Sequence, residues 1–577
     1  MKNLFVYLRA YKKEMVLSPL FKLLEAFFEL AVPLVVASIV DIGIDGENSA
    51  HIIKCTLLMA LLGFVGLICA VTAQFFAARA AVGFAEKVRS ALFRHIQTLS
   101  YTELDTLGTT SLITNMTSDV GQLQTGVNLV LRLFLRSPVI VFGAMIMAFT
   151  IDVNAAIPFV ILIPALSVVV FGIMLAGIPL YKRVQKKLDR MLGITRENLN
   201  GTRVVRAFNM EETERESFRL ANNDFTAAQK FAGGFSALMN PLTFVLVNAA
   251  IVLLIHRGAL RVESGVLTQG QLIALYNYMS QILVELVKLA NLIITVTKAV
   301  ASGNRIEEVL ETRPKETHSV AASAKASTSD AIRFENVSLR YSGAGAESLS
   351  NISFSIEKGQ VLGIIGSTGS GKSSLISMIP RFYPATKGQI FIDGKPIDAY
   401  SETELREKIG VVPQKAVLFK GTVRSNLLFG APNADEDVLR EALEASQAFD
   451  FVMKKTKGLD APVEQGGRNF SGGQRQRLTI ARALAMRPEI LILDDSASAL
   501  DYATDAALRK AIRALPYHPT TVVVSQRTSS IRFADKILVL NDGEAVGLGT
   551  HEELLQDCPI YKEIHDSQFE APKGDAV

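Results

Sequence analysis

The sequence predicts a multi-domain membrane protein, in which an all-α part with six membrane-spanning helices precedes an α/β domain of the P-loop kind. Three observations support this. The chain has 577 residues, too many for one hydrophobic core. Hydrophobic residues make up 49% and charged residues 20%, and the mean hydropathy is +0.28. The long apolar stretches lie in the first half, whereas a glycine-rich phosphate-loop pattern lies in the second.

Apolar stretches of about 20 residues are long enough to cross a bilayer as helices. Three stretches carry no charge at all: 55–78, 153–181 and 231–255. Three further candidates tolerate a few charges: 17–40, 127–151 and 271–299. Together they predict about six spans.

Lysine and arginine are concentrated in two long loops, 86–124 and 181–230, whereas the short loops 41–50 and 261–270 are poor in both. By the positive-inside rule the long loops, both termini and the second domain are expected to be cytoplasmic. The protein is therefore expected in the inner or plasma membrane as a multi-pass protein. A formal net charge of +4 is too small for this length to favour nucleic acid.

The predicted domains are a transmembrane domain at 1–312, a linker at 313–330, an α/β domain at 331–570 and a tail at 571–577. The linker is small, polar and aperiodic, which is typical of a flexible connector. In the α/β domain, short apolar runs at 361–365, 490–493 and 521–524 predict buried parallel strands.

The phosphate loop follows the first of these strands and precedes a predicted helix. Glycines let backbone N–H groups turn toward phosphate oxygens, and the helix N-terminus adds a positive dipole end. A lysine would reach the β and γ phosphates, and the serine after it would bind Mg²⁺. ATP and Mg²⁺ are therefore the expected cofactors. The loop comprises Gly366, Ser367, Thr368, Gly369, Ser370, Gly371, Lys372, Ser373 and Ser374.

Further residues of interest flank the loop in a fixed order. Tyr341 precedes it, where an aromatic ring is either core or a base-stacking group, and Gln414 follows it. A predicted helix start contains Ser471, Gly472, Gly473 and Gln474. Those residues either cap an ordinary helix or offer N–H groups to an anion. Asp494 ends an apolar strand, where a Mg²⁺-holding carboxylate is expected.

This set of motifs resembles an ATP-binding cassette half-transporter of the exporter kind over nearly the whole chain. The resemblance implies that Tyr341 stacks on adenine, that Gln414 senses Mg²⁺ and the γ-phosphate, and that Asp501 lies in a segment communicating across a dimer. It also implies that 470–474 is the family signature, which contacts ATP bound to a partner's phosphate loop. The tips of loops 102–119 and 200–218 resemble those that dock on the nucleotide-binding domains.

Two positions depart from the family pattern. Asp495 stands where the family normally has Glu, and Gln526 stands where it normally has His. The shorter carboxylate is set back by ~1.5 Å, and a misplacement of ~1 Å can cost about a hundredfold in rate. Gln has no titratable proton to shuttle. The chain's own site is therefore expected to bind ATP and hydrolyse it slowly.

The intact signature, by contrast, would serve a partner's ATP. The expected assembly is a heterodimer with a homologous half-transporter that carries Glu and His at the equivalent positions. ATP hydrolysis coupled to transport would take place mainly at the composite site formed with that partner.

Charges inside the spans are the sequence's pointers to a substrate path. Glu25 and Glu29 share a helix face, and Glu285 lies in the last span. Intramembrane ionisable groups usually face a bundle interior or a watery cavity. The glutamates either line a cavity for cationic amphipaths or pair internally, Glu25 with Lys22 and Glu285 with Lys288. Arg136 is expected near the cytoplasmic interface, with no role in transport.

The predicted function is that of one subunit of an ATP-driven exporter, most like heterodimeric bacterial multidrug exporters. Its substrate would be an amphipathic or hydrophobic small molecule. Membrane lipid would surround the protein itself. A lipid or peptide exporter is the alternative within this class. A nucleotide-gated channel or a regulatory membrane subunit is the alternative outside it. The long uncharged spans exclude a soluble ATPase.

Overall fold

A computed structural model of the chain describes residues 2–312, 330–496 and 498–569. All of the predicted linker except Asp330 lies outside these residues, and so does the predicted tail 571–577. The chain forms two compact units. One comprises Met1–Thr98 with Gly108–Thr312, and the other comprises Leu99–Leu107 with Arg313–Val577. The short segment Leu99–Leu107 thus groups with the C-terminal unit.

The first unit is entirely helical. Its described elements are η1 (Lys2–Tyr11), α1 (Lys12–Ser38), η2 (Ile39–Ile44), α2 (Ser49–Ile96), α4 (Thr109–Thr114), η3 (Asn115–Asp119), α5 (Val120–Leu133), α6 (Arg136–Ile151), α7 (Val153–Asn200), α8 (Thr202–Ala207), α9 (Glu211–Ala237), α10 (Met239–Glu263) and α11 (Gln269–Glu311).

Within the described residues, six helical segments are long and apolar enough to cross a membrane, which confirms the predicted number of spans. They are 3–44, 49–96, 109–151, 153–200, 211–263 and 269–311. Polar caps mark where several of them begin. Asn48 caps α2, Asp152 caps α7, and Thr268 forms a capping box with Gln271 at the start of α11.

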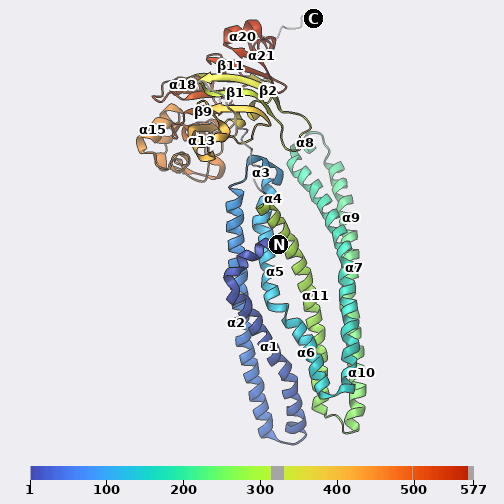
Figure 1. Ribbon diagram of the computed structural model, residues 1–577. Coiled ribbons are helices and arrows are strands. Elements are labelled where there is room, and N and C mark those ends of the chain that lie inside the picture. The colour runs from blue at the N-terminus through green and yellow to red at the C-terminus, as the bar shows by residue number, and fades with distance from the viewer. Residues whose placement is uncertain (1, 313–329, 497, 570–577) are drawn as a thin grey trace. The chain divides into compact units, whose positions relative to one another are not determined.

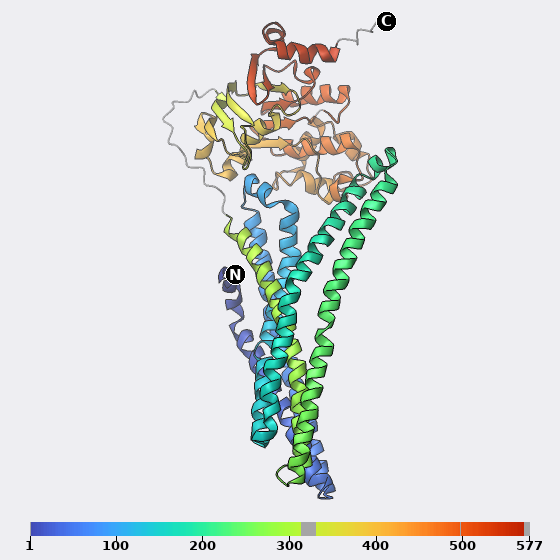
Figure 2. The same ribbon diagram turned by 90° about the vertical axis from the view of Figure 1, so that its right-hand side faces the viewer.

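Apolar faces hold two parts of the first unit together. One core is shared by α1, α6, α7, α10 and α11, and another joins η1, α2, α5 and α11. Beyond the first core, α7 and α9 run side by side as a two-helix arm that ends in α8, as Figures 1 and 2 both show. The two long basic loops, 86–124 and 181–230, are thus largely helical.

The third span is interrupted between α5 and α6. Phe134 and Leu135 form a turn, and the helix resumes at Arg136. Pro138 lies in the first turn of α6, where its missing N–H is tolerated because such groups have no intrahelical acceptor. The interruption sets Arg136 at the start of a new helix.

The second unit contains a six-stranded sheet in the order β12-β11-β3-β10-β9-β6, a four-stranded sheet in the order β2-β1-β4-β5 and a small pair, β7-β8. Its described strands are β1 (Asp330–Leu339), β2 (Leu349–Glu357), β3 (Val361–Gly366), β4 (Lys387–Ile392), β5 (Lys395–Pro396), β6 (Ile409–Val412), β7 (Gly421–Thr422), β8 (Pro462–Val463), β9 (Ile490–Asp494), β10 (Thr520–Val524), β11 (Lys536–Asn541) and β12 (Glu544–Gly549).

The helices of this unit surround the sheets, as Figure 1 shows for the orange and red parts of the chain. They are α3 (Tyr101–Leu107), α12 (Lys372–Met378), η4 (Ile397–Ala399), α13 (Glu402–Lys408), α14 (Val423–Leu427), α15 (Glu436–Ala445), α16 (Phe449–Met453), η5 (Gly458–Asp460), η6 (Gln465–Gly467), α17 (Gly472–Leu484), α18 (Tyr502–Arg513), α19 (Thr528–Ile531), α20 (His551–Asp557) and α21 (Pro559–Phe569).

The three predicted buried strands are β3, β9 and β10, which lie next to one another and pair in parallel. Every residue of β3 and β10 is buried, as their unbroken apolar or small-residue runs predicted. Because parallel strands end at the same edge, the residues that follow β3, β6, β9 and β10 are brought together there.

Candidate functional site

The phosphate loop connects β3 to α12. Gly369 has φ +87° and Gly371 has φ +97°, a backbone conformation that favours glycine. At Gly371 an added Cβ would also lie 2.7 Å from a methyl carbon of Leu349. The positive φ is therefore what favours glycine at Gly371, and the Leu349 methyl would also have to shift to admit a side chain.

Lys372 lies inside the loop. Its Nζ donates to the carbonyl oxygens of Gly366 and Ser367 at 2.8 and 2.6 Å, and to Ser370 Oγ at 3.3 Å. Burial lowers the pKa of Lys372, while the nearby carboxylates of Asp495 and Asp494 oppose that shift. The sequence-predicted lysine is thus held where a triphosphate would lie across the loop.

Two adjacent carboxylates follow β9. Burial raises the pKa of Asp494, and the neighbouring Asp495 raises it further, whereas a hydrogen bond from Ser373 and the charge of Lys372 lower it. The serine hydroxyl and the Asp494 carboxylate are therefore brought together. Hard oxygen ligands of this kind fit Mg²⁺ with ATP phosphates, so Ser373 and Asp494 would hold the ion and Lys372 the phosphates.

Asp495 and Gln414 lie at the same edge. Gln414 Nε2 donates to Asp495 Oδ2 at 3.5 Å, a long hydrogen bond that joins the ends of β6 and β9. Asp495 has φ +44°, unusual for a residue other than glycine, and its N–H donates to Val524 O at 3.1 Å. Gln526 follows β10 and is exposed. The two positions that depart from the family pattern thus follow neighbouring strands, β9 and β10.

Tyr341 lies beside the start of α12. Its hydroxyl donates to Ser374 Oγ at 2.9 Å, and its ring meets that of Tyr383 edge-on with centroids 5.0 Å apart. The contact with α12 puts the ring next to the phosphate loop, and its stacking on adenine remains a prediction.

The signature residues form the start of α17. Ser471 and Gln474 make a capping box, with Gln474 N donating to Ser471 Oγ and Ser471 N to Gln474 Oε1. Ser471 and Gly472 are exposed. Among the described residues, no hydrogen bond or ion pair joins this helix start to the phosphate loop of the same chain.

Asp501 caps α18 by accepting from the backbone N–H and the hydroxyl of Thr504, both at 2.9 Å. These hydrogen bonds lower the pKa of Asp501. An added Cβ at Gly473 would lie 3.0 Å from Ala499 O, so this segment borders the signature. Its predicted role across a dimer remains a prediction.

A charged network lies among the spans. Arg136 donates to Glu285 Oε1 at 2.7 Å and to Glu29 Oε2 at 2.6 Å, and its Nε lies 3.8 Å from Glu25 Oε1. Lys22 pairs with Glu25 at 2.5 Å and Lys288 with Glu285 at 2.8 Å, as internal pairing would require. Each predicted substrate-path glutamate is thus engaged by a cation.

The expectation that Arg136 lies at the cytoplasmic interface is wrong, because Arg136 is only 7% exposed and binds glutamates from two other spans. Its partners are 107 and 149 residues away in the chain, so no local pattern reveals them. The only signal in the sequence was a charge within a predicted span.

The segment α3 packs against the α/β domain within the second unit. The ring of Tyr101 stacks on Phe382 with centroids 4.5 Å apart, and Tyr383 Oη donates to Asp105 Oδ2 at 2.5 Å. Sequence analysis anticipated a docking loop in this region but not Phe382 or Tyr383, which carry no motif.

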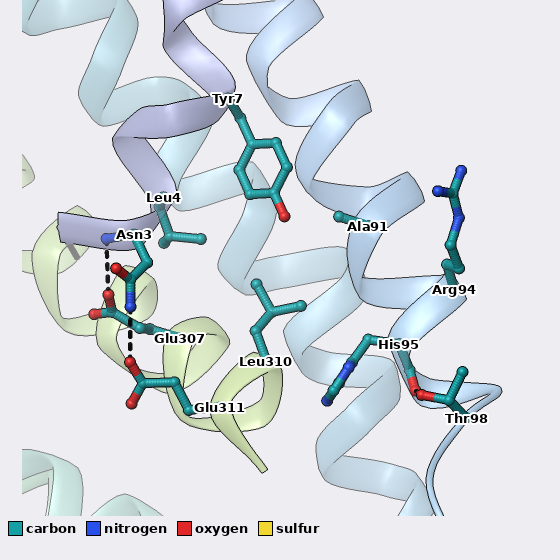
Figure 3. Close-up of a pocket in the computed structure, with 10 residues that line it drawn as sticks. All are labelled: Asn3, Leu4, Tyr7, Ala91, Arg94, His95, Thr98, Glu307, Leu310 and Glu311. Carbon is teal, nitrogen blue, oxygen red and sulfur yellow. Dashed lines mark hydrogen bonds between the residues drawn. The ribbon is translucent and has the colours of Figure 1, made fainter. Parts of the chain in front are cut away.

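A cavity of about 530 Å³ lies between η1, α2 and α11, as Figure 3 shows. Asn3 bridges η1 and α11 there by donating from its backbone N–H to Glu307 and from its side-chain amide to Glu311, at 3.0 and 2.8 Å (Figure 3). His95 Nε2 lies 2.9 Å from Thr312 O. The Asn3 bonds fix η1 to the end of α11, and the His95 contact holds α2 to the residue that follows α11.

Comparison with known proteins identifies both parts. The family described as ABC transporter transmembrane region matches residues 15–286, and the family described as ABC transporter matches residues 349–498. The chain resembles a solved structure titled "Structure of a bacterial Atm1-family ABC exporter with ATP bound". Their TM-score is 0.81 and their identity 24%, over 97% of this chain and 99% of the other, which establishes the fold.

Three curated relatives are similar over most of their length. "Uncharacterized ABC transporter ATP-binding protein YfiB" of Bacillus subtilis is 35% identical over 99% of both chains. "Putative multidrug export ATP-binding/permease protein YgaD" of the same organism is 30% identical over 98% of this chain and 99% of that protein. "ATP-dependent lipid A-core flippase" of Syntrophus aciditrophicus is 31% identical over 84% of this chain and 80% of that protein. The six spans, the phosphate-loop domain and these matches together show that the chain belongs to the ABC transporter family, as an exporter half-transporter.

Proposed function

We propose that this chain is one subunit of a heterodimeric, ATP-driven exporter of amphipathic or hydrophobic compounds. Its own phosphate loop binds ATP and hydrolyses it slowly, and its signature completes the partner's active site. The observation that carries this proposal is the pair Asp495 and Gln526, which follow the neighbouring strands β9 and β10 beside an otherwise complete phosphate loop.

Binding and hydrolysis depend on different residues in this site. Lys372, Ser373 and Asp494 hold the triphosphate and Mg²⁺, and Tyr341 stacks on adenine, so ATP binding is retained. Asp495 has a shorter side chain than the Glu that polarises the attacking water, and Gln526 has no proton to shuttle. Slow hydrolysis follows because a carboxylate misplaced by ~1 Å can cost about a hundredfold in rate.

The features that point to a partner lie on exposed surfaces. Ser471 and Gly472 face solvent at the start of α17. The α7–α9 arm ends at α8, where Val204 and Phe208 are 60% and 72% exposed. Apolar side chains at a cytoplasmic loop tip are suited to docking on another chain. A homodimer would have two weak sites, so a partner with Glu and His is required for brisk turnover.

In the proposed cycle both termini and the cassette are cytoplasmic, in an inner or plasma membrane, with domains at 1–312, 331–570 and a linker at 313–330. ATP closes two cassettes head-to-tail and favours an outward-facing cavity. Hydrolysis at the composite site then resets the pump. Asp501, in the segment bordering the signature, takes part in communication across the dimer.

The charged network among the spans bears on the substrate. Glu25, Glu29 and Glu285 are each paired with a cation, so they offer no uncompensated negative charge to a cationic drug. This favours amphipaths bound mainly through apolar contact. A lipid exporter is the second candidate, favoured by the similarity to the lipid A-core flippase. A peptide exporter, a nucleotide-gated channel or a regulatory membrane subunit could share the same fold, and transport measurements separate them.

Co-purification from the native membrane tests the heterodimer directly. We expect a second half-transporter with Glu and His at the two positions, and a complex that accumulates a fluorescent amphipath in inverted vesicles only with ATP. A pure homodimer with rapid ATP hydrolysis would refute the slow-site assignment. ATP-dependent flux that only dissipates a gradient would favour the channel.

A further inference from the structure

An aromatic cluster joins the candidate nucleotide site to α3, the tip of the first cytoplasmic loop. It comprises Tyr341, Tyr383, Tyr101 and Phe382. The ring of Tyr383 meets that of Tyr341 edge-on at 5.0 Å and lies 6.0 Å from that of Tyr101, tilted by 57°. Tyr383 therefore stands between the residue placed to stack on adenine and the loop tip.

Hydroxyl groups anchor both ends of this contact. Tyr341 Oη donates to Ser374 Oγ at 2.9 Å, on the helix that opens at the phosphate loop. Tyr383 Oη donates to Asp105 Oδ2 at 2.5 Å, on α3. Burial, and then the Asp105 carboxylate, raise the pKa of Tyr383. Its hydroxyl thus stays protonated at neutral pH and remains a donor.

The cluster borders a cavity of about 680 Å³ that is lined from both sides, by Ser100, Thr102 and Glu103 of the loop tip and by Arg340 and Arg381 of the α/β domain. Phe382 and Tyr383 are consecutive residues, and both contact Tyr101. A displacement of the Tyr341 ring would therefore be passed to Tyr101 of α3 by Tyr383 and its neighbour Phe382.

We propose that Tyr383 is a positioning residue that couples adenine bound at Tyr341 to the docking of α3 on the cassette. This inference rests on the proposed adenine-stacking role of Tyr341. Adenine against one face of Tyr341 fixes that ring, which fixes Tyr383 and with it the hydrogen bond to Asp105. Because α3 continues into the spans on both sides, its docking passes the presence of nucleotide to the membrane part.

The coupling depends on the base and not on the phosphates. The phosphates contact the loop through Lys372 and backbone N–H groups, none of which belongs to the cluster. Inorganic tripolyphosphate with Mg²⁺ fills the phosphate positions and leaves Tyr341 without a stacking partner. It is therefore the probe that separates the two parts of the ligand.

The test measures hydrogen exchange of the 101–107 amides in the full chain, reconstituted in lipid nanodiscs. ATP with Mg²⁺ should slow exchange about tenfold, the scale of one hydrogen bond to a carboxylate, and tripolyphosphate should slow it less than about twofold. Tyr383→Phe should abolish the difference between the two ligands. Tyr400→Phe is the matched control, because Tyr400 lines the same cavity but donates to Ile392 O.

Thermodynamic linkage gives a second readout. If bound ATP strengthens the docking of α3 by some factor, docked α3 must strengthen the affinity for ATP by the same factor. Tyr383→Phe should weaken ATP binding by up to about tenfold and leave tripolyphosphate binding unchanged. Asp105→Asn keeps a hydrogen-bond acceptor and should retain part of the effect, which a loss by misfolding would not allow.

The proposal is wrong if tripolyphosphate protects α3 as well as ATP does, or if Tyr383→Phe keeps the full ATP-specific protection. It is equally wrong if Tyr383→Phe weakens both ligands alike. Failure of the wild-type chain to bind ATP would instead refute the proposed function of the site.

Discussion

Replacing Arg136 should destabilise the membrane unit more than replacing any single outer member of its network. Arg136 donates to Glu285 at 2.7 Å and to Glu29 at 2.6 Å, and both Arg136 and Glu285 are buried. Without Arg136, Glu29 loses its cation and the buried Glu285 keeps only Lys288 and the Ser137 hydroxyl. Removing one partner of a buried ion pair typically costs about 3–5 kcal/mol. Arg136→Gln should lower the free energy of unfolding by that amount.

Lys288→Gln is the matched control. Lys288 also binds Glu285, at 2.8 Å, but its side chain is 43% exposed. An exposed ion pair contributes at most about 1 kcal/mol. The loss of unfolding free energy should therefore depend on how buried the replaced cation is, and not merely on the number of ion pairs that it makes.

The assay is unfolding of the purified chain by titration with a denaturing detergent, followed by circular dichroism. A double variant, Arg136→Met with Glu285→Met, should recover part of the loss, because both buried charges are removed and the two partners left behind, Glu29 and Lys288, are 39% and 43% exposed and can be solvated. Equal losses for Arg136→Gln and Lys288→Gln would refute the reasoning. The reasoning would also be refuted if the loss of unfolding free energy in the double variant equalled the sum of the losses in the two single variants.

Three further predictions concern the nucleotide site. Asp495→Glu combined with Gln526→His should speed ATP hydrolysis at this loop at least about tenfold, within the hundredfold that ~1 Å of misplacement can cost. The assay uses a partner whose own phosphate-loop lysine is replaced, so that only this site hydrolyses ATP. No gain in rate would contradict the slow-site assignment. Lys372→Ala should weaken ATP binding at least about tenfold in equilibrium titration, because a charge-assisted contact to phosphate is lost; unchanged affinity would show that the loop does not hold the triphosphate. Because burial raises the pKa of Asp494, protons compete with Mg²⁺ there, so Mg²⁺-dependent ATP binding should weaken as the pH falls toward that raised pKa. Asp494→Asn should remove this pH dependence, and a dependence that persists would place the ion elsewhere.

The sequence was sufficient for features that repeat locally. Uncharged runs such as 153–181 fix the spans, because a charge in hydrocarbon is costly. The apolar runs of β3 and β10 fix buried parallel strands, because both faces of such a sheet are covered. The pairs Lys22–Glu25 and Glu285–Lys288 were also foreseeable, since residues three apart share a helix face.

Contacts between distant segments were not foreseeable. Arg136 meets Glu285 only because α6 and α11 pack together, and a single sequence carries no record of that packing. Tyr383 likewise has no motif, and its partner Asp105 is 278 residues earlier. Asp119 binds Arg305 across 186 residues in the same way. In each case tertiary packing, and not local propensity, supplies the partner.

In the proposed site, most of the residues assigned to ATP binding lie apart from the two positions assigned to water activation, Asp495 and Gln526, and both departures from the family pattern fall at those two positions. The proposed phosphate-binding residues lie on the loop after β3 and on α12, where Lys372 is already held by the carbonyls of Gly366 and Ser367. The water-activating positions lie after β9 and β10. We infer that substitutions there slow hydrolysis without loosening the loop, because no hydrogen bond in the described structure links Asp495 or Gln526 to the loop's backbone. A loop that retains ATP would hold two cassettes together while the partner's site turns over.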